Sequence, residues 1–283
     1  MANTHDTWTW TTKDGLKLAA QSWTPEGECQ AVLCIVHGMG EHAGRYADFA
    51  ARFNDQGYAV LSYDHRGHGN SDGPRGHTPS YDALLNGVDL LLKEARTHHD
   101  GKPCFLWGHS MGGNVVLNYV LRRKPALTGV IVTGPWLRLA KEPPAIQVAF
   151  GRIMDRIWPG FGQNTGLNDE FISRDPAAVE AYRNDPLVHY RISAHMFLSC
   201  HDAGQYALDH AGEFTLHLLL MHGGADQLTS PEGSRVFNAK APDCCTYKEW
   251  DGCYHELHNE PEKDDVFRAM VDWMQSRIAA PAK

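Results

Sequence analysis

The sequence predicts an α/β protein, with a mostly parallel central sheet flanked by helices and a helical cap inserted between two strands. Short, nearly continuous apolar runs alternate with amphipathic helical patterns, which is typical of parallel strands that are buried on both faces. The alternation stops after Pro135 and resumes at residue 216, so the intervening segment reads as an insertion. A serine between glycines directly follows one apolar run, where a helical pattern begins.

The expected elements follow from this alternation in chain order. The chain begins with a hairpin whose arms, residues 6–12 and 16–23, are rich in strand-forming residues. Later apolar runs predict buried strands, and the segments between them have helical spacing. The predicted strands are 30–38, 58–67, 102–110, 128–135, 216–226 and 244–252, and the predicted helices are 45–57, 81–96, 111–122 and 264–278.

The distribution of these elements divides the chain into a domain that contains the sheet and a segment inserted into it. Residues 1–135 and 206–283 are expected to form the main α/β domain, and residues 136–205 are expected to form an inserted cap. The cap segment contains several prolines and helical patterns, and no strand is predicted in it.

Composition and charge exclude several classes of protein. The net charge of −8 argues against a nucleic-acid partner, because such proteins present a basic face. No apolar run reaches the ~20 residues that a membrane-crossing helix needs. The polar N-terminus has no signal-peptide pattern, so we expect a cytoplasmic location. The chain has seven cysteines, an odd number that cannot all pair in disulfides, and in the cytoplasm we expect the thiols to be reduced.

Ser110 lies where the sequence predicts an abrupt corner. Residues 104–107 run directly into Gly108-His109-Ser110-Met111-Gly112, and a helical pattern starts there. A strand–turn–helix corner of the G-x-S-x-G type exposes the serine hydroxyl at the end of a parallel sheet. The alternative is an ordinary tight turn, since glycine and serine favour turns in any case. We expect Ser110 to be a nucleophile.

A serine hydroxyl needs a base to activate it, and the base needs an acid to orient it. In this type of fold the acid and then the histidine follow the serine along the chain. Asp226 ends a predicted strand and His255 opens the loop after the last one, so both lie beyond carboxyl ends of strands. We predict Asp226 as the acid and His255 as the base. The competing residues are His222 and His258 for the base, and Asp202 and Asp251 for the acid.

Acyl transfer also requires N–H donors for the oxyanion that forms on the substrate carbonyl. Met111 follows the nucleophile, and its backbone N–H would be one donor. The turn His37-Gly38-Met39-Gly40 follows an earlier strand, and its glycines let the backbone approach a ligand. We therefore predict the Met39 N–H as the second donor; a tight turn without a catalytic role is the alternative.

Six segments carry a resemblance to a known family. They are HGMGEHAGRY (37–46), DHRGHGNSDG (64–73), GHSMGG (108–113), YRNDPLVH (182–189), HGGADQLTSP (222–231) and YHELHNEPE (254–262). In this order they resemble the α/β-hydrolase branch that contains monoacylglycerol lipases and related lysophospholipases. The resemblance spans about residues 7–278 and implies the same catalytic residues and oxyanion donors as the residue pattern.

The resemblance also implies a polar end of the pocket that binds a glycerol head group. Fixed hydrogen-bonding groups would favour a leaving group that carries hydroxyls. The implied head-group residues are Glu41, Arg45, His109, Tyr182 and His258. Two of them, Glu41 and Arg45, could instead pair with each other and brace a loop.

An apolar stripe at helical spacing marks the cap segment 143–162. The stripe could pack on the catalytic domain or, as the resemblance suggests, line an acyl tunnel and make transient contact with a membrane or micelle. Trp136 departs from the resemblance, which implies a smaller residue at this position, and the preferred acyl length is therefore left open. The stripe residues are Ile146, Phe150, Ile153, Met154, Ile157 and Trp158.

The sequence indicates no cofactor and no metal. His65, His68 and His77 lie in a glycine-rich loop and could suggest zinc, but no further ligand and no role for a metal are evident.

Taken together, these patterns predict a serine hydrolase that cleaves monoacylglycerols, as small lipid ester substrates, to glycerol and fatty acid through an acyl-enzyme. One alternative keeps the triad in a broader carboxylesterase, thioesterase or lysophospholipase. Another, of a different class, is a catalytically silent hydrolase fold that binds a ligand. An aminopeptidase is disfavoured because no carboxylate pair marks the cap as a site for an amine. The oligomeric state is left open.

Overall fold

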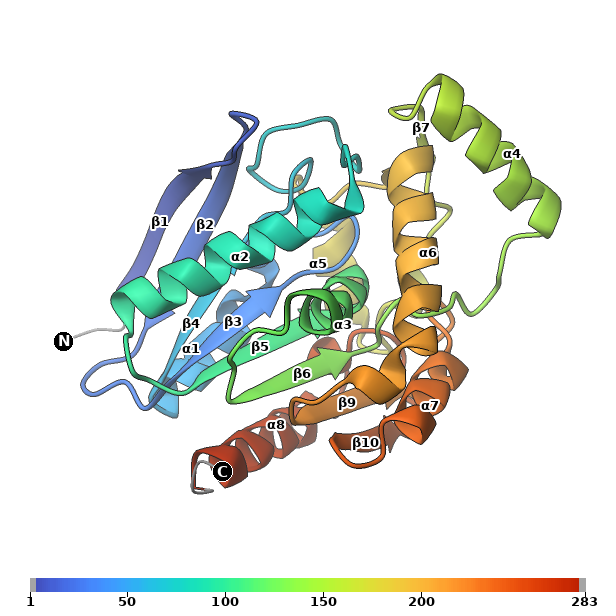
Figure 1. The fold of residues 1–283 in the computed structure, drawn as a ribbon. Helices are drawn as coiled ribbons and strands as arrows, with labels where there is room; N and C mark the ends of the chain where they lie inside the picture. Colours follow the sequence, from blue (N-terminus) through green and yellow to red (C-terminus); the bar gives the residue numbers. More distant parts are fainter. Residues whose placement is uncertain (1–3, 280–283) are drawn as a thin grey trace.

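An eight-stranded sheet forms the centre of the computed structural model, which describes residues 4–279 (Figure 1). The strand order is β1-β2-β4-β3-β5-β6-β9-β10. β2 pairs antiparallel with β1 and with β4, and every other pairing in this sheet is parallel. The predicted α/β class with a mostly parallel sheet is therefore confirmed. The strands are β1 (Thr4–Thr11), β2 (Lys17–Thr24), β3 (Ala31–Val36), β4 (Tyr58–Tyr63), β5 (Cys104–His109), β6 (Gly129–Thr133), β9 (Leu218–Gly223) and β10 (Cys245–Trp250).

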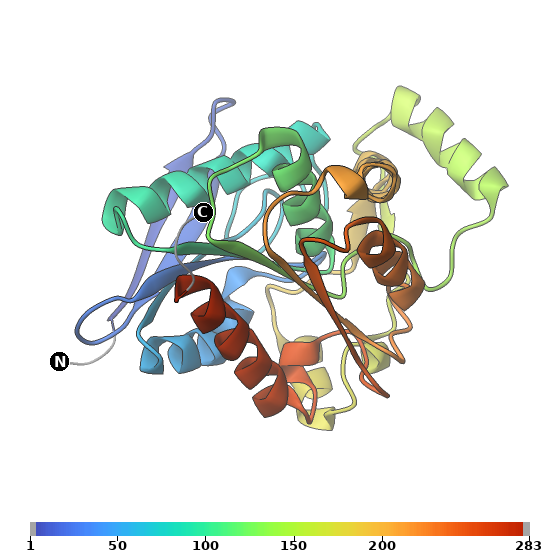
Figure 2. The same ribbon diagram turned by 60° about the horizontal axis from the view of Figure 1, so that its bottom comes forward.

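Helices cover both faces of the sheet, which explains why its inner strands are apolar throughout. α1 (Ala47–Asp55) and α8 (Lys263–Ile278) pack on one face, and α2 (Tyr81–His98), α3 (Met111–Arg123) and α7 (Pro231–Lys240) lie on the other (Figure 2). Each strand sends alternate side chains into two separate cores, so all six residues of β3 and of β4 are buried.

The predicted hairpin, parallel strands and four helices are confirmed, with ends shifted by a few residues. α7 is an additional helix that is not among the predicted elements. Its start signal is present in the sequence, because Pro231 occupies the first turn, where a missing N–H costs nothing.

The segment between β6 and β9 contains most of the remaining secondary structure. β7 and β8 pair there as a two-stranded antiparallel sheet, so the expectation of a segment without strands was wrong. Strands of three residues are too short to show a period of two in the sequence. The elements are α4 (Ala145–Ile157), β7 (Gly162–Asn164), α5 (Pro176–Asn184), β8 (Arg191–Ser193) and α6 (Ala194–Asp209). Within residues 4–279 the 3-10 helices are η1 (Ala43–Tyr46), η2 (Asp169–Phe171), η3 (Ala211–Glu213) and η4 (Leu257–Asn259).

α6 joins this segment to the core and extends past residue 205, the predicted end of the cap. The side-chain amide groups of Asn114 and Asn118 on α3 donate to the carbonyl groups of Cys200 and Ala203 on α6, at 3.0 and 2.9 Å. α4 contains no buried residue and stands away from the body of the molecule (Figure 1).

The predicted division into a catalytic domain (1–135 and 206–283) and a cap (136–205) stays a prediction, and residues 1–3 and 280–283 of it lie outside the described residues. None of the helices within residues 4–279 has the length and apolar character that a bilayer crossing requires.

Candidate active site

Ser110 occupies a strained corner between β5 and α3. Its φ of 54° and ψ of −118° are unfavourable for a residue with a side chain, and they persist only where the surroundings impose them. Two glycines permit the close packing that imposes this geometry. A Cβ on Gly112 would lie 2.0 Å from the Val36 carbonyl oxygen of β3, and a Cβ on Gly108 would lie 2.4 Å from the Gly112 carbonyl oxygen. The close approach of α3 to the strands therefore holds Ser110 at the tip of the turn.

Asp226 and His255 are joined by a short hydrogen bond in the buried interior. The His255 Nδ1–H donates to Asp226 Oδ2 at 2.7 Å, which leaves Nε2 of the neutral ring without a proton. The backbone N–H groups of Leu228 and Thr229 donate to Asp226 Oδ1 at 2.8 and 3.0 Å. Burial opposes ionisation of this carboxyl group, but His255 and His222 outweigh burial and hold the pKa of Asp226 well below its usual range.

Two further residues contact Asp226: His222, the competing candidate for the base, and Thr229, to which the sequence pattern assigned no role. His222 is fully buried on β9, with Nε2 at 3.1 Å from Asp226 Oδ2 and Nδ1 at 2.7 Å from the Ser234 hydroxyl. The Thr229 hydroxyl lies 2.9 Å from Asp226 Oδ2 and 3.0 Å from the Gly134 carbonyl oxygen. The structure thus places His222 behind the carboxylate. The Asp226-x-x-Thr229 spacing was a signal for this contact, because aspartate often accepts hydrogen bonds from groups two or three residues onward.

The other competing residues lie away from this pair. Asp202 is about half exposed and pairs with Arg152 at 2.7 Å on the surface, and Asp251 is exposed. For His255, burial opposes protonation, but the adjacent Asp226 carboxylate outweighs burial and raises the pKa of the ring above 6.5. The His255 ring is therefore a stronger base than an ordinary histidine.

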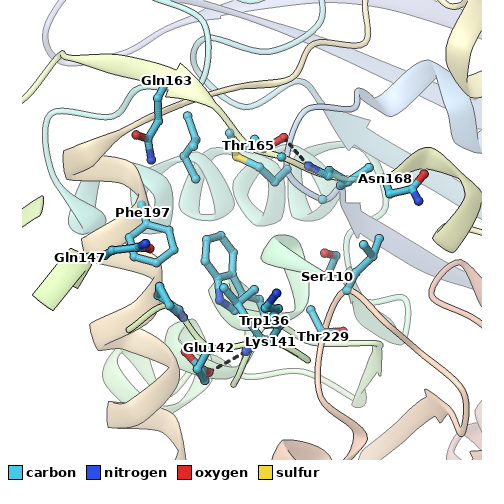
Figure 3. A pocket seen from close by; sticks show the side chains of 18 of the residues that line it. Ser110, Trp136, Lys141, Glu142, Gln147, Gln163, Thr165, Asn168, Phe197 and Thr229 are labelled. Atoms are coloured by element: carbon cyan, nitrogen blue, oxygen red, sulfur yellow. Dashed lines mark hydrogen bonds between the residues drawn. The ribbon is translucent and has the colours of Figure 1, made fainter. Parts of the chain in front are cut away.

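Ser110 and His255 both line one cavity of about 1110 Å³ beneath the segment between β6 and β9. Figure 3 shows Ser110 on one side of this cavity, opposite Gln147 of α4 and Phe197 of α6. Most of the wall is apolar, and the polar side chains near Ser110 are a minority. Apolar residues of the wall include Trp136, Leu139, Ile146, Phe150, Met154 and Phe197.

The predicted oxyanion donors flank Ser110. Met111 is the first residue of α3, and the first N–H groups of a helix have no acceptor within the helix. Met39 lines the cavity. The loop that carries Met39 approaches Ser110 closely, since a Cβ on Gly38 would lie 3.1 Å from the Ser110 Cβ.

The structure brings three of the five implied head-group residues, Glu41, His109 and Tyr182, to the cavity wall. Arg45 lies outside the lining and pairs with Glu41 Oε2 at 2.7 Å and with both oxygens of Glu256 at 2.7 and 2.8 Å. The alternative of a bracing ion pair thus describes the contacts of Arg45. Glu256 lines the cavity as well, and its position directly after His255 was the signal that could have indicated it.

The two carboxylates of this cluster have different electrostatic environments. Burial raises the pKa of Glu41, and the Arg45 guanidinium only partly offsets that effect. For Glu256, burial acts in the same direction, but the two-point contact with Arg45 outweighs it and lowers the pKa. Glu41 accepts hydrogen bonds from the Gly38 N–H at 2.5 Å and from the Tyr46 hydroxyl at 2.9 Å.

His258, the fifth implied residue, lies outside the cavity lining. The ring is 2% exposed and stacks on Tyr46 with centroids 5.0 Å apart, and Trp107 and His109 present their rings to it edge-on at 5.5 and 5.0 Å. Burial is the main cause that lowers the pKa of His258 to about 4, so the ring is neutral at pH 7. In this position His258 supports the wall from behind.

The apolar stripe of α4 and the following Trp158 is largely exposed. The exposed fractions are 79% for Ile146, 62% for Phe150, 54% for Ile153, 73% for Ile157 and 61% for Trp158, and Ile146, Phe150 and Met154 also line the cavity. Since no α4 residue is buried, the interpretation that the stripe packs on the catalytic domain was wrong.

Trp136, which left the acyl length open, is buried against Phe197 with ring centroids 5.7 Å apart. Both rings form part of the cavity wall, so Trp136 shapes the cavity without closing it.

The described residues contain one group that could supply three metal ligands within 4.8 Å of one another, namely Cys253, Glu260 and Glu262. Arg174 already donates hydrogen bonds to both carboxylates and therefore supplies the positive charge there. Of the histidines considered for zinc, His77 contacts the Ser193 hydroxyl at 2.9 Å. We therefore assign no metal site.

Comparisons with known proteins identify the family of this chain. The sequence pattern of the family described as serine aminopeptidase, S33, matches residues 27–262. The chain is 32% identical over 266 residues to a monoacylglycerol lipase from Mycolicibacterium smegmatis, covering 93% of this chain and 95% of that one. It is 35% identical over 272 residues to an uncharacterised abhydrolase domain-containing protein from Dictyostelium discoideum, covering 94% of this chain but spanning only 28% of that relative's length.

The structure is similar to that of Paleococcus ferrophilus monoacylglycerol lipase, with a TM-score of 0.83 and 34% identity over 98% of this chain and 100% of that one. The resemblance inferred from the six sequence segments is thereby confirmed. With a family pattern that covers most of its length, the chain belongs to the serine aminopeptidase, S33, family of α/β-hydrolases.

Proposed function

We propose that this protein hydrolyses the ester bond of monoacylglycerols to glycerol and free fatty acid through an acyl-enzyme. One observation carries the proposal: the strained Ser110 and the Asp226-bound His255 line the same largely apolar cavity. This arrangement combines a nucleophile, an oriented base and space for a long apolar chain. Relatives with monoacylglycerol lipase activity in their names support the same substrate class.

In the proposed acylation step, His255 Nε2 removes the hydroxyl proton while Ser110 Oγ attacks the ester carbonyl carbon. Asp226 stabilises the imidazolium that forms and keeps the ring in the tautomer that can accept at Nε2. The N–H groups of Met39 and Met111 stabilise the oxyanion, each contributing about 3 kcal/mol. His255 then donates its proton to the glycerol oxygen as the C–O bond breaks, which leaves the acyl group on Ser110.

Deacylation repeats these roles with water as the nucleophile. His255 removes a proton from water, the resulting tetrahedral intermediate collapses, and Ser110 Oγ recovers the proton as the fatty acid leaves. The proposed acylation and deacylation steps require no cofactor.

The polar groups beside Ser110 support a hydroxyl-bearing leaving group. Glu41, His109 and Tyr182 line the cavity, and they can hydrogen-bond to glycerol hydroxyls. The buried contacts with Arg45 hold Glu41 in place, so that this end of the cavity is pre-organised. A leaving group without hydroxyls would leave these groups unpaired, which disfavours it.

We also propose that the exposed stripe of α4 contacts a lipid surface during substrate uptake. Ile157 and Trp158 expose large apolar side chains, and α4 residues that line the cavity lie on the same helix. A lipid taken from a membrane would therefore enter along α4.

We further propose a cytoplasmic location for this protein. All seven cysteines are free thiols, and reduced thiols are typical of proteins in that compartment.

Ser110→Ala and a panel of substrates test the proposed activity. We expect the wild-type protein to hydrolyse monoacylglycerols of graded chain length and to react with a fluorophosphonate probe, and the variant to do neither. Lysophospholipids, short aryl esters and an aminoacyl anilide serve as the alternative substrates. Faster turnover of any of these would favour another hydrolase, and probe labelling that survives the substitution would contradict an enzyme that uses Ser110.

Asp226→Asn tests which carboxylate orients His255. We expect kcat to fall on the order of 10⁴-fold, because an amide cannot stabilise the imidazolium and favours the wrong tautomer. Asp251→Asn, at the competing position, is the matched control and should keep nearly full activity. A loss of less than tenfold for Asp226→Asn would show that another carboxylate has this role.

The dependence of activity on pH tests the raised pKa of His255. Because the base must be neutral, kcat/KM for a soluble ester should rise with pH through a midpoint above 6.5, the ordinary value. Steady-state rates from pH 5 to 9 measure this midpoint. An acid limb centred below 6.5 would mean that burial outweighs the Asp226 carboxylate.

Ile157→Glu tests contact between α4 and lipid. The side chain is exposed and lies outside the cavity lining, so we expect weaker binding to phospholipid vesicles and unchanged hydrolysis of a short soluble ester. Ala51→Glu adds the same charge to an exposed position of α1 and is the matched control. Equal vesicle binding by both variants and the wild type, measured by co-sedimentation, would refute the contact.

A further inference from the structure

His37 follows β3 and is completely buried, outside the lining of the cavity. Two backbone groups contact its ring: Nδ1 lies 2.8 Å from the Gly38 carbonyl oxygen, and the His65 N–H donates to Nε2 at 2.9 Å. A carbonyl oxygen only accepts, so Nδ1 carries the proton; a backbone N–H only donates, so Nε2 is bare. The structure therefore defines one neutral tautomer of this ring.

The Gly38 carbonyl belongs to the same peptide group as the Met39 N–H. In a trans peptide the C=O and N–H bonds point in opposite directions, and the described residues contain no cis peptide. A donor that holds the carbonyl oxygen on the buried side therefore directs the Met39 N–H away from that side. Met39 lines the cavity.

The preceding peptide group is held as well. The Gly38 N–H donates to Glu41 Oε1, so side chains hold both peptide groups that meet at Gly38. A residue with a side chain could not replace this glycine without displacement, because its Cβ would lie 2.8 Å from Glu41 Oε1. The position of the loop beside Ser110 is thus defined by hydrogen bonds rather than by packing alone.

We propose that His37 is a positioning residue for hydrolysis: its Nδ1–H holds the Gly38 carbonyl and thereby aims the Met39 N–H at the oxyanion. This inference rests on the proposed function, in which Met39 is an oxyanion donor. The same contact also polarises the peptide group, since a carbonyl that accepts a hydrogen bond makes its N–H a stronger donor. His37 acts entirely through the peptide group and does not touch the substrate.

Two substitutions separate the two hydrogen bonds of the ring. In His37→Asn the side-chain amide can place a donor near the position of Nδ1, whereas in His37→Gln it can place an acceptor near the position of Nε2. We expect His37→Gln to lower kcat by about 10–100-fold and to leave KM nearly unchanged. This loss is smaller than the loss on complete removal of an oxyanion donor, because the Met39 N–H is still present. His37→Asn should retain kcat within about threefold of the wild type, because it restores the donor.

His68→Gln controls for lost stability. His68 is completely buried, its ring lies 5.4 Å from that of His37, and its Nδ1 contacts the Arg66 carbonyl oxygen instead of the oxyanion loop. We expect this variant to unfold at a lower temperature but to keep the wild-type kcat. Thermal unfolding of all variants separates effects on stability from effects on turnover.

The assay uses p-nitrophenyl butyrate, because hydrolysis of any ester forms an oxyanion. Failure of the protein to hydrolyse monoacylglycerols would therefore leave the test of His37 intact, and inactivity of Ser110→Ala on this ester shows that the measured turnover uses Ser110. A wild-type kcat in His37→Gln, or equal losses in the Asn and Gln variants, would overturn the positioning role.

A second measurement needs no folded variant. Nitrogen chemical shifts of the wild-type protein labelled with ¹⁵N-histidine report the tautomer of each ring. We expect His37 to be neutral with its proton on Nδ1 throughout the pH range of the activity. A proton on Nε2, or a charged ring, would overturn the proposal.

Discussion

The close packing of α3 against β3 and β5 is the constraint on which the rest of the site depends. Gly108 and Gly112 let the helix begin within contact distance of the Val36 carbonyl group, and Ser110 takes a left-handed backbone conformation as the result. A side chain at either glycine would require the helix to retreat. The same packing sets the first N–H groups of α3 beside the serine, where they favour negative charge.

Buried charge at the carboxyl edge of the sheet is a second constraint. Asp226 is ionised in the interior because donors surround it: two backbone N–H groups, two histidines and a threonine hydroxyl. The cluster of Glu41, Arg45 and Glu256 follows the same principle on the other side of His255. Unpaired, any of these charges would destabilise the fold, so the hydrogen bonds that orient the site also make it compatible with burial.

The segment between β6 and β9 has a rigid part and an exposed part. α6 is bound to α3 through the asparagine side chains of Asn114 and Asn118, and its residues belong to the main core. α4 has no buried residue, yet it supplies part of the cavity wall. The part of the cavity wall that α6 supplies is consequently anchored to the core, whereas the part that α4 supplies has no buried residue.

The sequence alone determined the fold class, the order of the strands along the chain and the identity of the residues at the strand ends. Apolar runs, helical spacing and the G-x-S-x-G corner are local patterns, and local patterns can be recognised in the sequence alone. Because parallel strands end at one edge, the order of Ser110, Asp226 and His255 along the chain was enough to predict that they would gather there.

Only the tertiary structure decided which of the other polar residues face the cavity. Arg45 and His258 match the family pattern as well as Glu41 does, but the packing of Tyr46 and Trp107 turns His258 inward, and Glu256 draws Arg45 into a buried ion pair. The contact of His37 with the oxyanion loop was equally hidden, as was the exposure of α4. Burial and the direction of a side chain depend on contacts between residues far apart in the chain, and no local pattern encodes them.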